Sequence, residues 1–141
     1  MTKSPRQLKL LAIDPGSVRL GFAVWNPAAQ LSRALPVWTR KGLKNDLNFI
    51  GELIGQNEIE AFLVGLPISL GGHETPSTEN ARFWIEKLES EFALPVYTQD
   101  ESLSSKEAEK LLKATKTRSK KTKLDSVAAA IFLEEFIREQ S

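Results

Sequence analysis

Apolar positions follow two different periods along the chain. Between residues 8 and 39 they form short continuous or alternating runs, which favour strands, and from Gly42 many recur at the three- and four-residue spacing of a helix. The predicted strands are Leu8–Ile13, Leu20–Trp25, Ala34–Thr39, Ala61–Val64 and Pro95–Thr98. The predicted helices cover about 42–55, 76–92, 104–112 and 125–138. Strands and helices therefore alternate after an initial run of three strands.

Turn and capping residues mark the ends of these segments. Asp14-Pro15-Gly16 ends the first strand with a strong turn signal. Thr75 followed by Pro76 is a favourable start for the second helix, and Ser104 with Glu107 forms a capping box for the third. Pro36 cannot donate to a strand ladder, so the third strand is predicted at the edge of the sheet.

The order of these elements predicts an α/β fold. We expect a five-stranded mixed sheet, with an antiparallel meander of the first three strands, parallel fourth and fifth strands, and helices on both faces. A chain of 141 residues fits one domain, residues 1–141, and shows no internal repeat. If the first, fourth and fifth strands run parallel, Asp14, Gly65 and the pair Asp100-Glu101 meet at their carboxyl ends, where such sheets bind ligands.

The composition of the chain restricts its possible chemistry more than it restricts its fold. The absence of cysteine excludes thiolate nucleophiles and cysteine-based zinc sites, and a Ser-His-Asp triad would depend on the single His73. The longest apolar runs, 61–66 and 127–133, are far shorter than the roughly 20 residues of a membrane span, and the N-terminus has no signal-peptide core. We therefore expect a cytoplasmic protein without membrane contact. The net charge of +1 indicates that any nucleic-acid binding rests on local clusters of cations.

The turn after the first strand carries the first candidate for chemistry. Alone, Asp14 is explained equally well as a residue that shapes the turn through its side chain. The segment 14–23 also places glycine where the backbone must turn sharply, so the acid is held rigidly at the strand end. This segment resembles the Asp-x-Gly-x-x-Arg-x-Gly-x-Ala pattern of the YqgF/RuvX family and meets every fixed position of it.

The resemblance to the YqgF/RuvX family continues in order through nearly the whole chain. The further matching segments are Val64–Pro67, Ala81–Phe83, Asp100–Ser104 and Leu124–Ala130. The resemblance implies an RNase H-like, metal-dependent endonuclease or exonuclease. It also implies a structured nucleic-acid substrate, either RNA, in 5′-end maturation of the precursor of small-subunit ribosomal RNA, or branched DNA, in Holliday junction resolution. Either a monomer or a homodimer is compatible with these roles, although symmetric junction cutting expects a dimer.

By the same resemblance, Asp14, Glu101 and Asp125 are the catalytic residues and the metal ligands. Each has a plainer explanation, which for Asp125 is capping of the last helix. Because side chains alternate along a strand, only one of Asp100 and Glu101 should face the site, and we favour Glu101. The family often has arginine after this glutamate, whereas this chain has Ser102.

The implied ligands determine which metals are expected. Three carboxylates without histidine or cysteine suit Mg²⁺ or Mn²⁺ better than zinc. Two ions roughly 4 Å apart would serve in-line displacement at phosphorus without a protein nucleophile.

The most basic stretch of the chain runs directly into Asp125 and contains no acid. Its cations are Lys113, Lys116, Arg118, Lys120, Lys121 and Lys123. Such a run is often only a solvated loop, but its position predicts contacts with the phosphates that flank a scissile bond. Arg19, near Asp14, is a further candidate for nucleic-acid binding.

Three other functions are compatible with parts of this pattern. A RuvC-type resolvase begins with a similar turn but places two aspartates near the start of its last helix, where this chain has only Asp125. A sugar kinase or actin-like ATPase needs a second lobe, for which the chain is too short. A catalytically inactive nucleic-acid-binding module is disfavoured because all three acids are present.

Overall fold

The computed structural model describes residues 3–67, 74–100 and 120–140, and in the last range it describes side chains from residue 126 onward. In chain order the elements are η1 (Pro5–Gln7), β1 (Leu10–Pro15), β2 (Arg19–Asn26), β3 (Leu31–Thr39), α1 (Leu43–Asn57), β4 (Ala61–Leu66), α2 (Pro76–Phe92), β5 (Val96–Asp100) and α4 (Lys120–Glu139). The helix predicted after Ser104 and the loop with His73 lie outside the described residues.

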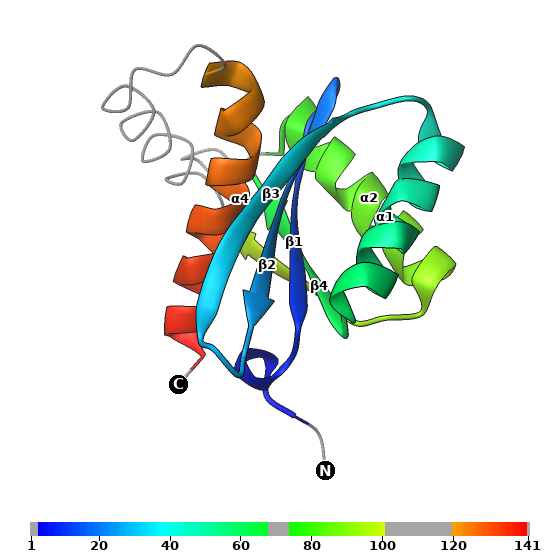
Figure 1. Cartoon of the computed structure of the whole chain (residues 1–141). Helices are drawn as coiled ribbons and strands as arrows, with labels where there is room; N and C mark the ends of the chain where they lie inside the picture. The colour runs from blue at the N-terminus through cyan, green and yellow to red at the C-terminus, as the bar shows by residue number, and fades with distance from the viewer. Residues whose placement is uncertain (1–2, 68–73, 101–119, 141) are drawn as a thin grey trace.

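The strands form a mixed sheet in the order β3-β2-β1-β4-β5 (Figure 1). The pairs β1–β2 and β2–β3 are antiparallel, whereas β1–β4 and β4–β5 are parallel. This confirms the predicted α/β fold with its antiparallel meander and its parallel fourth and fifth strands. β3, which contains Pro36, lies at the edge of the sheet, as expected for a strand with a missing donor.

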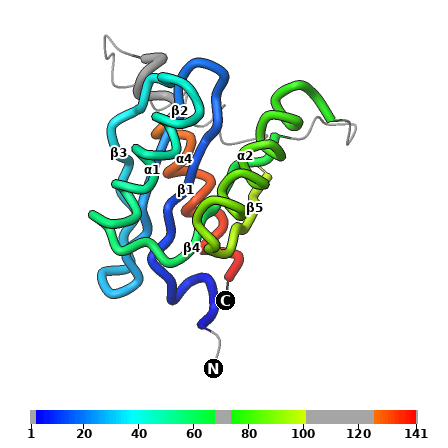
Figure 2. Tube along the Cα trace, turned by 90° about the vertical axis from the view of Figure 1, so that its right-hand side faces the viewer, coloured from blue at the N-terminus to red at the C-terminus, as the bar shows by residue number. Residues whose placement is uncertain are grey.

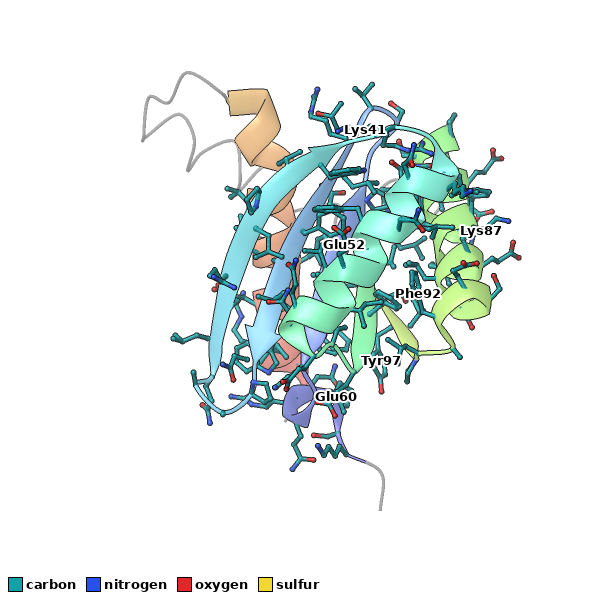
Figure 3. The ribbon with its side chains drawn as sticks, turned by 45° about the vertical axis from the view of Figure 1, so that its right-hand side comes forward. Lys41, Glu52, Glu60, Lys87, Phe92 and Tyr97 are labelled. Atoms are coloured by element: carbon teal, nitrogen blue, oxygen red, sulfur yellow. The ribbon has the colours of Figure 1, made fainter. Side chains whose placement is uncertain are left out.

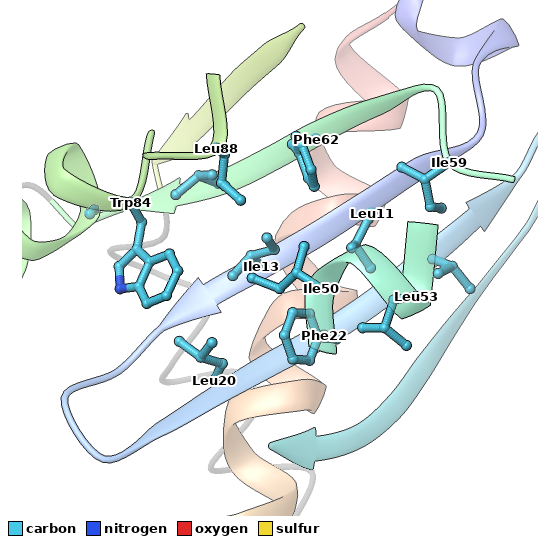
Figure 4. Close-up of a cluster of buried hydrophobic side chains, with 13 residues drawn as sticks. Leu11, Ile13, Leu20, Phe22, Ile50, Leu53, Ile59, Phe62, Trp84 and Leu88 are labelled. Atoms are coloured by element: carbon cyan, nitrogen blue, oxygen red, sulfur yellow. The ribbon is translucent and has the colours of Figure 1, made fainter. Parts of the chain in front are cut away.

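Helices cover both faces of the sheet, as predicted. α1 and α2 lie on one face and α4 on the other (Figures 1 and 2). On the first face, side chains including Leu11, Ile13, Phe22 and Trp84 form one buried cluster (Figure 4). On the second face, Leu10, Ala12 and Ala23 pack against α4. Side chains of β1 therefore alternate strictly between two cores, because successive residues of a strand point to opposite faces.

The start of α2 follows from its sequence. The Thr75 side chain accepts a hydrogen bond from the Thr78 backbone N–H, and Pro76 occupies the first turn, where no donor is needed. The Thr78 hydroxyl donates to the Pro67 carbonyl just beyond β4. Ala81, Trp84 and Leu88 are fully buried, at the three- and four-residue spacing of one helical face.

The prediction for the last helix is wrong at its N-terminus. α4 begins at Lys120 and not near Asp125, so Lys120, Lys121 and Lys123 belong to the helix and not to a loop before it. Lysine has a good helix propensity, and no glycine or proline interrupts the segment, so the charge run does not prevent helix formation. Asp125 therefore cannot be the cap of this helix. No helix in the described ranges is long and apolar enough to cross a membrane.

Candidate active site

Asp14 lies inside β1, near the carboxyl end of a central strand. The strand runs two residues further than predicted, and Asp14 pairs with Gly21 of β2. Its neighbour Ile13 pairs with Val64 of β4, so the next residue of β4, Gly65, lies beside Asp14. Ile13 is fully buried, whereas Asp14 is only partly buried.

Asp14 shares the α4 face of the sheet with two glycines. Leu10 and Ala12 belong to the cluster beneath α4, so strand alternation places Asp14 on the same face. Gly21 has the parity of Ala23 in β2, and Gly65 has the parity of Leu63 in β4, both in that cluster. The residues beside Asp14 on the two neighbouring strands are therefore glycines, which have no side chain to cover the Asp14 carboxylate on this face.

The backbone after Asp14 is held at two points. The Asn80 side-chain amide of α2 donates to the Pro15 carbonyl at 3.2 Å. The Gly16 N–H donates to the Arg19 carbonyl at 2.9 Å and closes the hairpin. A Cβ at residue 16 would lie 2.4 Å from that carbonyl oxygen, so only glycine fits there. Asp14 is therefore presented on a rigid support.

Asp100, the last residue of β5, lies on the opposite face of the sheet from Asp14. Tyr97 packs on Phe136 of α4, and the Gln99 side-chain amide lies 3.5 Å from Glu139 of the same helix. Asp100 follows Gln99 and so has the opposite parity, which puts it on the face of α1 and α2. This is a reason to leave Asp100 out of the site. Glu101 lies outside the described residues and stays a prediction.

α4 approaches the sheet beside Asp14 through Ser126. This serine is buried, and its Oγ accepts a hydrogen bond of 3.2 Å from the backbone N–H of Phe22, the residue after Gly21. Asp125 directly precedes Ser126, so its backbone lies at the same end of the sheet as Asp14. The role of Asp125 as a ligand stays a prediction, because its side chain is not among those described.

The predicted nucleic-acid-binding residues divide into three groups. Lys120, Lys121 and Lys123 lie in the first turns of α4, before Asp125. Arg19 begins β2, two residues before the glycine opposite Asp14, and is partly buried. Outside the described residues lie Lys113, Lys116 and Arg118.

Sequence reasoning missed a second acid, Asp46 of α1, which is fully buried at the same end of the sheet. Its carboxylate accepts hydrogen bonds from Trp38 Nε1 (2.8 Å), Arg40 Nε (3.0 Å) and the Lys41 backbone N–H (2.9 Å). Burial alone would raise the pKa of Asp46, but these bonds and the Arg40 charge outweigh it and lower the pKa below 3.8. The overlooked signal is its position, three residues after Leu43, on the apolar stripe of the helix.

The described side chains test the expected metals only in part. Among them, no group of three or more acids or histidines converges, and of the three predicted ligands only Asp14 has a described side chain. What the structure does offer is a rigid carboxylate with a glycine on each side, which fits a hard cation that prefers oxygen ligands. A hollow of about 410 Å³, lined partly by Lys9, Arg33 and Ile59, lies at the opposite end of the sheet.

The sheet order and the two helical layers define an RNase H-like domain. The fold is similar to that of T. thermophilus RuvC in complex with a Holliday junction substrate, with a TM-score of 0.58, 18% identity and coverage of 94% of this chain and 96% of that one. It is also similar to the fowlpox virus resolvase bound to Holliday junction DNA, with a TM-score of 0.55, 12% identity and coverage of 94% and 98%. At these identities the similarity concerns the fold alone.

Within this class, the chain belongs to the RuvX family, described as a Holliday junction resolvase family, whose model matches residues 8–139. A protein of Koribacter versatilis is 38% identical over 92% of this chain and 86% of its own length. A protein of Dictyoglomus thermophilum is 34% identical over 95% of this chain and 98% of its own length. Both carry the provisional name of pre-16S rRNA nuclease.

Proposed function

We propose that this protein is a metal-dependent nuclease that hydrolyses phosphodiester bonds in structured nucleic acid. The observation that carries the proposal is Asp14, a partly buried carboxylate held rigidly at the end of a central strand between Gly21 and Gly65. Membership of the RuvX family supports the same reaction.

In the proposed site, Asp14, Glu101 and Asp125 hold two Mg²⁺ or Mn²⁺ ions. When bound, such ions supply an activated water and stabilise the leaving oxygen during in-line displacement. The contribution of the chain is to fix its carboxylates before substrate arrives, since misplaced ligands cost catalysis. The Asn80 bond to Pro15 and the Gly16 turn do this for Asp14.

We further propose that the cations at the start of α4, together with Arg19, bind backbone phosphates on either side of the scissile bond. Lys120, Lys121 and Lys123 precede Asp125 on the same helix. Contacts of this kind position the nucleic acid and add affinity without reading its sequence.

The favoured substrate is the precursor of small-subunit ribosomal RNA, because relatives matched over most of their length are named for it. The family description favours a second candidate, the four-way DNA junction. Both expose phosphodiesters to the same carboxylates, so one site serves either reaction.

A cleavage panel tests the proposal directly. Purified protein is incubated with precursor ribosomal RNA that retains its 5′ extension, unstructured single-stranded RNA, and a four-way DNA junction, each with Mn²⁺, with Mg²⁺ or with EDTA. We expect cleavage of at least one structured substrate with metal and none with EDTA. Failure to cut any substrate, or cutting that persists in EDTA, would reject the proposed function.

A further inference from the structure

One buried hydroxyl group links α4 to the middle of the sheet. Ser126 is 4% exposed, and its Oγ accepts the hydrogen bond from the Phe22 backbone N–H at 3.2 Å across 104 positions of sequence. The side chain of Phe22 points to the other face, into the cluster beneath α1 and α2 (Figure 4). The link therefore joins the helix to the backbone of β2 itself.

The backbone of β2 is irregular at this point. The register between β2 and β3 shifts between Leu20 and Phe22, where Leu20 pairs with Trp38 but Phe22 pairs with Leu35. Such a shift interrupts the regular strand ladder. A buried N–H needs an acceptor, so the Ser126 hydroxyl has a defined structural partner.

The position of this bond matters because Gly21, the residue before Phe22, pairs with Asp14. Asp125 is the residue before Ser126. The hydrogen bond thus joins the residue after the β2 partner of Asp14 to the residue after Asp125. The proposed function assigns these two acids to one metal site.

The other contacts of the described α4 side chains are non-directional or lie further along the helix. Ala129, Phe132 and Leu133 bury apolar surface, which is a non-directional interaction. The hydrogen bonds from Ser32 to Glu134 (2.7 Å) and from Gln99 to Glu139 (3.5 Å) are exposed and lie further toward the C-terminus of the helix. The part-buried bond from Arg6 Nη1 to the Ile137 carbonyl (3.3 Å) lies there too. A hydrogen bond restricts both distance and angle, so Ser126 provides a directional contact between α4 and β2 near Asp14.

We propose that Ser126 is a positioning residue, whose bond to the backbone of β2 sets the separation of Asp125 from Asp14 and thereby the affinity of the site for divalent ions. This inference rests on the proposed function. Hydrogen bonds outside the ligands themselves orient the ligands of many metal sites, and loss of such a bond typically weakens metal binding by about 10- to 100-fold. We expect the buried Ser126 to act in the same way.

The test compares two serines that each link α4 to a strand. Mn²⁺ affinity is measured by calorimetry for the wild type, Ser126→Ala, Ser126→Thr and the control Ser32→Ala, which removes the exposed bond to Glu134. We expect Ser126→Ala to weaken Mn²⁺ binding about tenfold or more. Ser126→Thr, which keeps the oxygen acceptor, and Ser32→Ala should stay within about twofold of the wild type.

Two further measurements separate positioning from loss of folding. Hydrogen exchange at the Phe22 amide should accelerate in Ser126→Ala, while circular dichroism stays that of the wild type. If Ser126→Ala does not fold, Ser126→Cys replaces it, because sulfur is a weak acceptor of similar size. An unchanged Mn²⁺ affinity in the folded variant, or an equal loss in Ser32→Ala, would overturn the inference. If the wild type neither binds Mn²⁺ nor cleaves nucleic acid, the proposed function fails instead.

Discussion

An aspartate lies on each side of the sheet at the same end of the molecule, Asp46 on α1 and Asp14 in β1, and the two differ in burial and in surroundings. Asp46, beneath α1, is fully buried and accepts three hydrogen bonds from the segment 38–41. Asp14, on the face of α4, is partly buried and lies between two glycines. Figure 3 shows Lys41 at this end and Glu60 at the opposite end.

This difference separates an acid whose role in the fold is visible from one for which we propose a functional role. The acceptors of Asp46 are used within the protein, where they connect the end of β3 to α1 and leave no access for a ligand. Asp14 is partly buried, and the backbone after it is held by Asn80 and by the Gly16 turn. The same residue type thus stabilises one face of the fold and, in the proposed function, supplies a metal ligand on the other.

The largest expected effect is on catalysis, in Asp14→Asn. Loss of the charge should lower the rate of Mn²⁺-dependent cleavage by about a thousandfold, as when a principal electrostatic group is removed from an active site. The melting temperature should change little, because asparagine keeps the size of the side chain and the strand pairing of residue 14 with Gly21. Initial rates and thermal unfolding measure both quantities. Asp100→Asn is the control, and it should cleave normally, whereas a variant of Asp14 that cleaves normally would remove the distinction between the faces.

The opposite pattern is expected for Asp46→Asn. Three donors lose a charged acceptor in a buried setting, so the free energy of unfolding should fall by about 3 kcal/mol. The cleavage rate per folded molecule should match the wild type. Urea unfolding and active-fraction kinetics test this pair of outcomes. A variant of unchanged stability, or a folded variant without activity, would show that Asp46 is not a purely structural acid.

A smaller effect is expected from the basic start of α4. Replacing Lys120, Lys121 and Lys123 by glutamine should weaken nucleic-acid binding about tenfold at moderate salt and reduce the slope of log K against log salt by about 2 to 3.

The control for these lysines removes three positive charges from the other face, at Lys9, Arg33 and Lys87. Lys9 pairs with Glu58, and Lys87 lies over the Phe83 ring, away from Asp14. This variant should keep the wild-type salt slope in fluorescence anisotropy titrations. Equal slopes in the two variants would mean that binding does not distinguish the faces.

The smallest expected effect is on the pH dependence of the contribution of Asp46 to the free energy of unfolding. The pKa of Asp46 is lower in the folded state than its ordinary value of 3.8, so the unfolded chain binds more protons near that pH. The stabilisation is complete above the unfolded pKa and is lost as the pH falls through the folded pKa. The stability difference between the wild type and Asp46→Asn should therefore be constant near neutral pH and shrink below about pH 4. Urea unfolding between pH 7 and pH 3 measures it, and a difference that grows on acidification would contradict the assignment.

The sequence by itself determined the order and type of the helices and strands that the structure describes from β1 onward, because apolar periodicity and turn residues act locally. Pro36 placed its strand at the edge, and Thr75 with Pro76 started α2 where predicted. The motif around Asp14 identified the family, which the match over residues 8–139 confirms. The roles of Glu101 and Asp125 stay predictions.

Only the tertiary structure decided which polar groups meet. The hydrogen bond between Phe22 and Ser126 joins residues 104 positions apart, so no local sequence pattern predicts it. The position of Asp46 on the apolar stripe of α1 could indicate burial, but only the fold showed that its donors come from Trp38 of β3 and from Arg40 just after it. α4 begins earlier than the run of lysines suggested. Lysine is compatible with a helix, and the later turns of α4 are stabilised by packing on the sheet. Hydrophobic patterning is readable from the chain because burial is periodic, whereas hydrogen-bond partners depend on distances that exist only after folding.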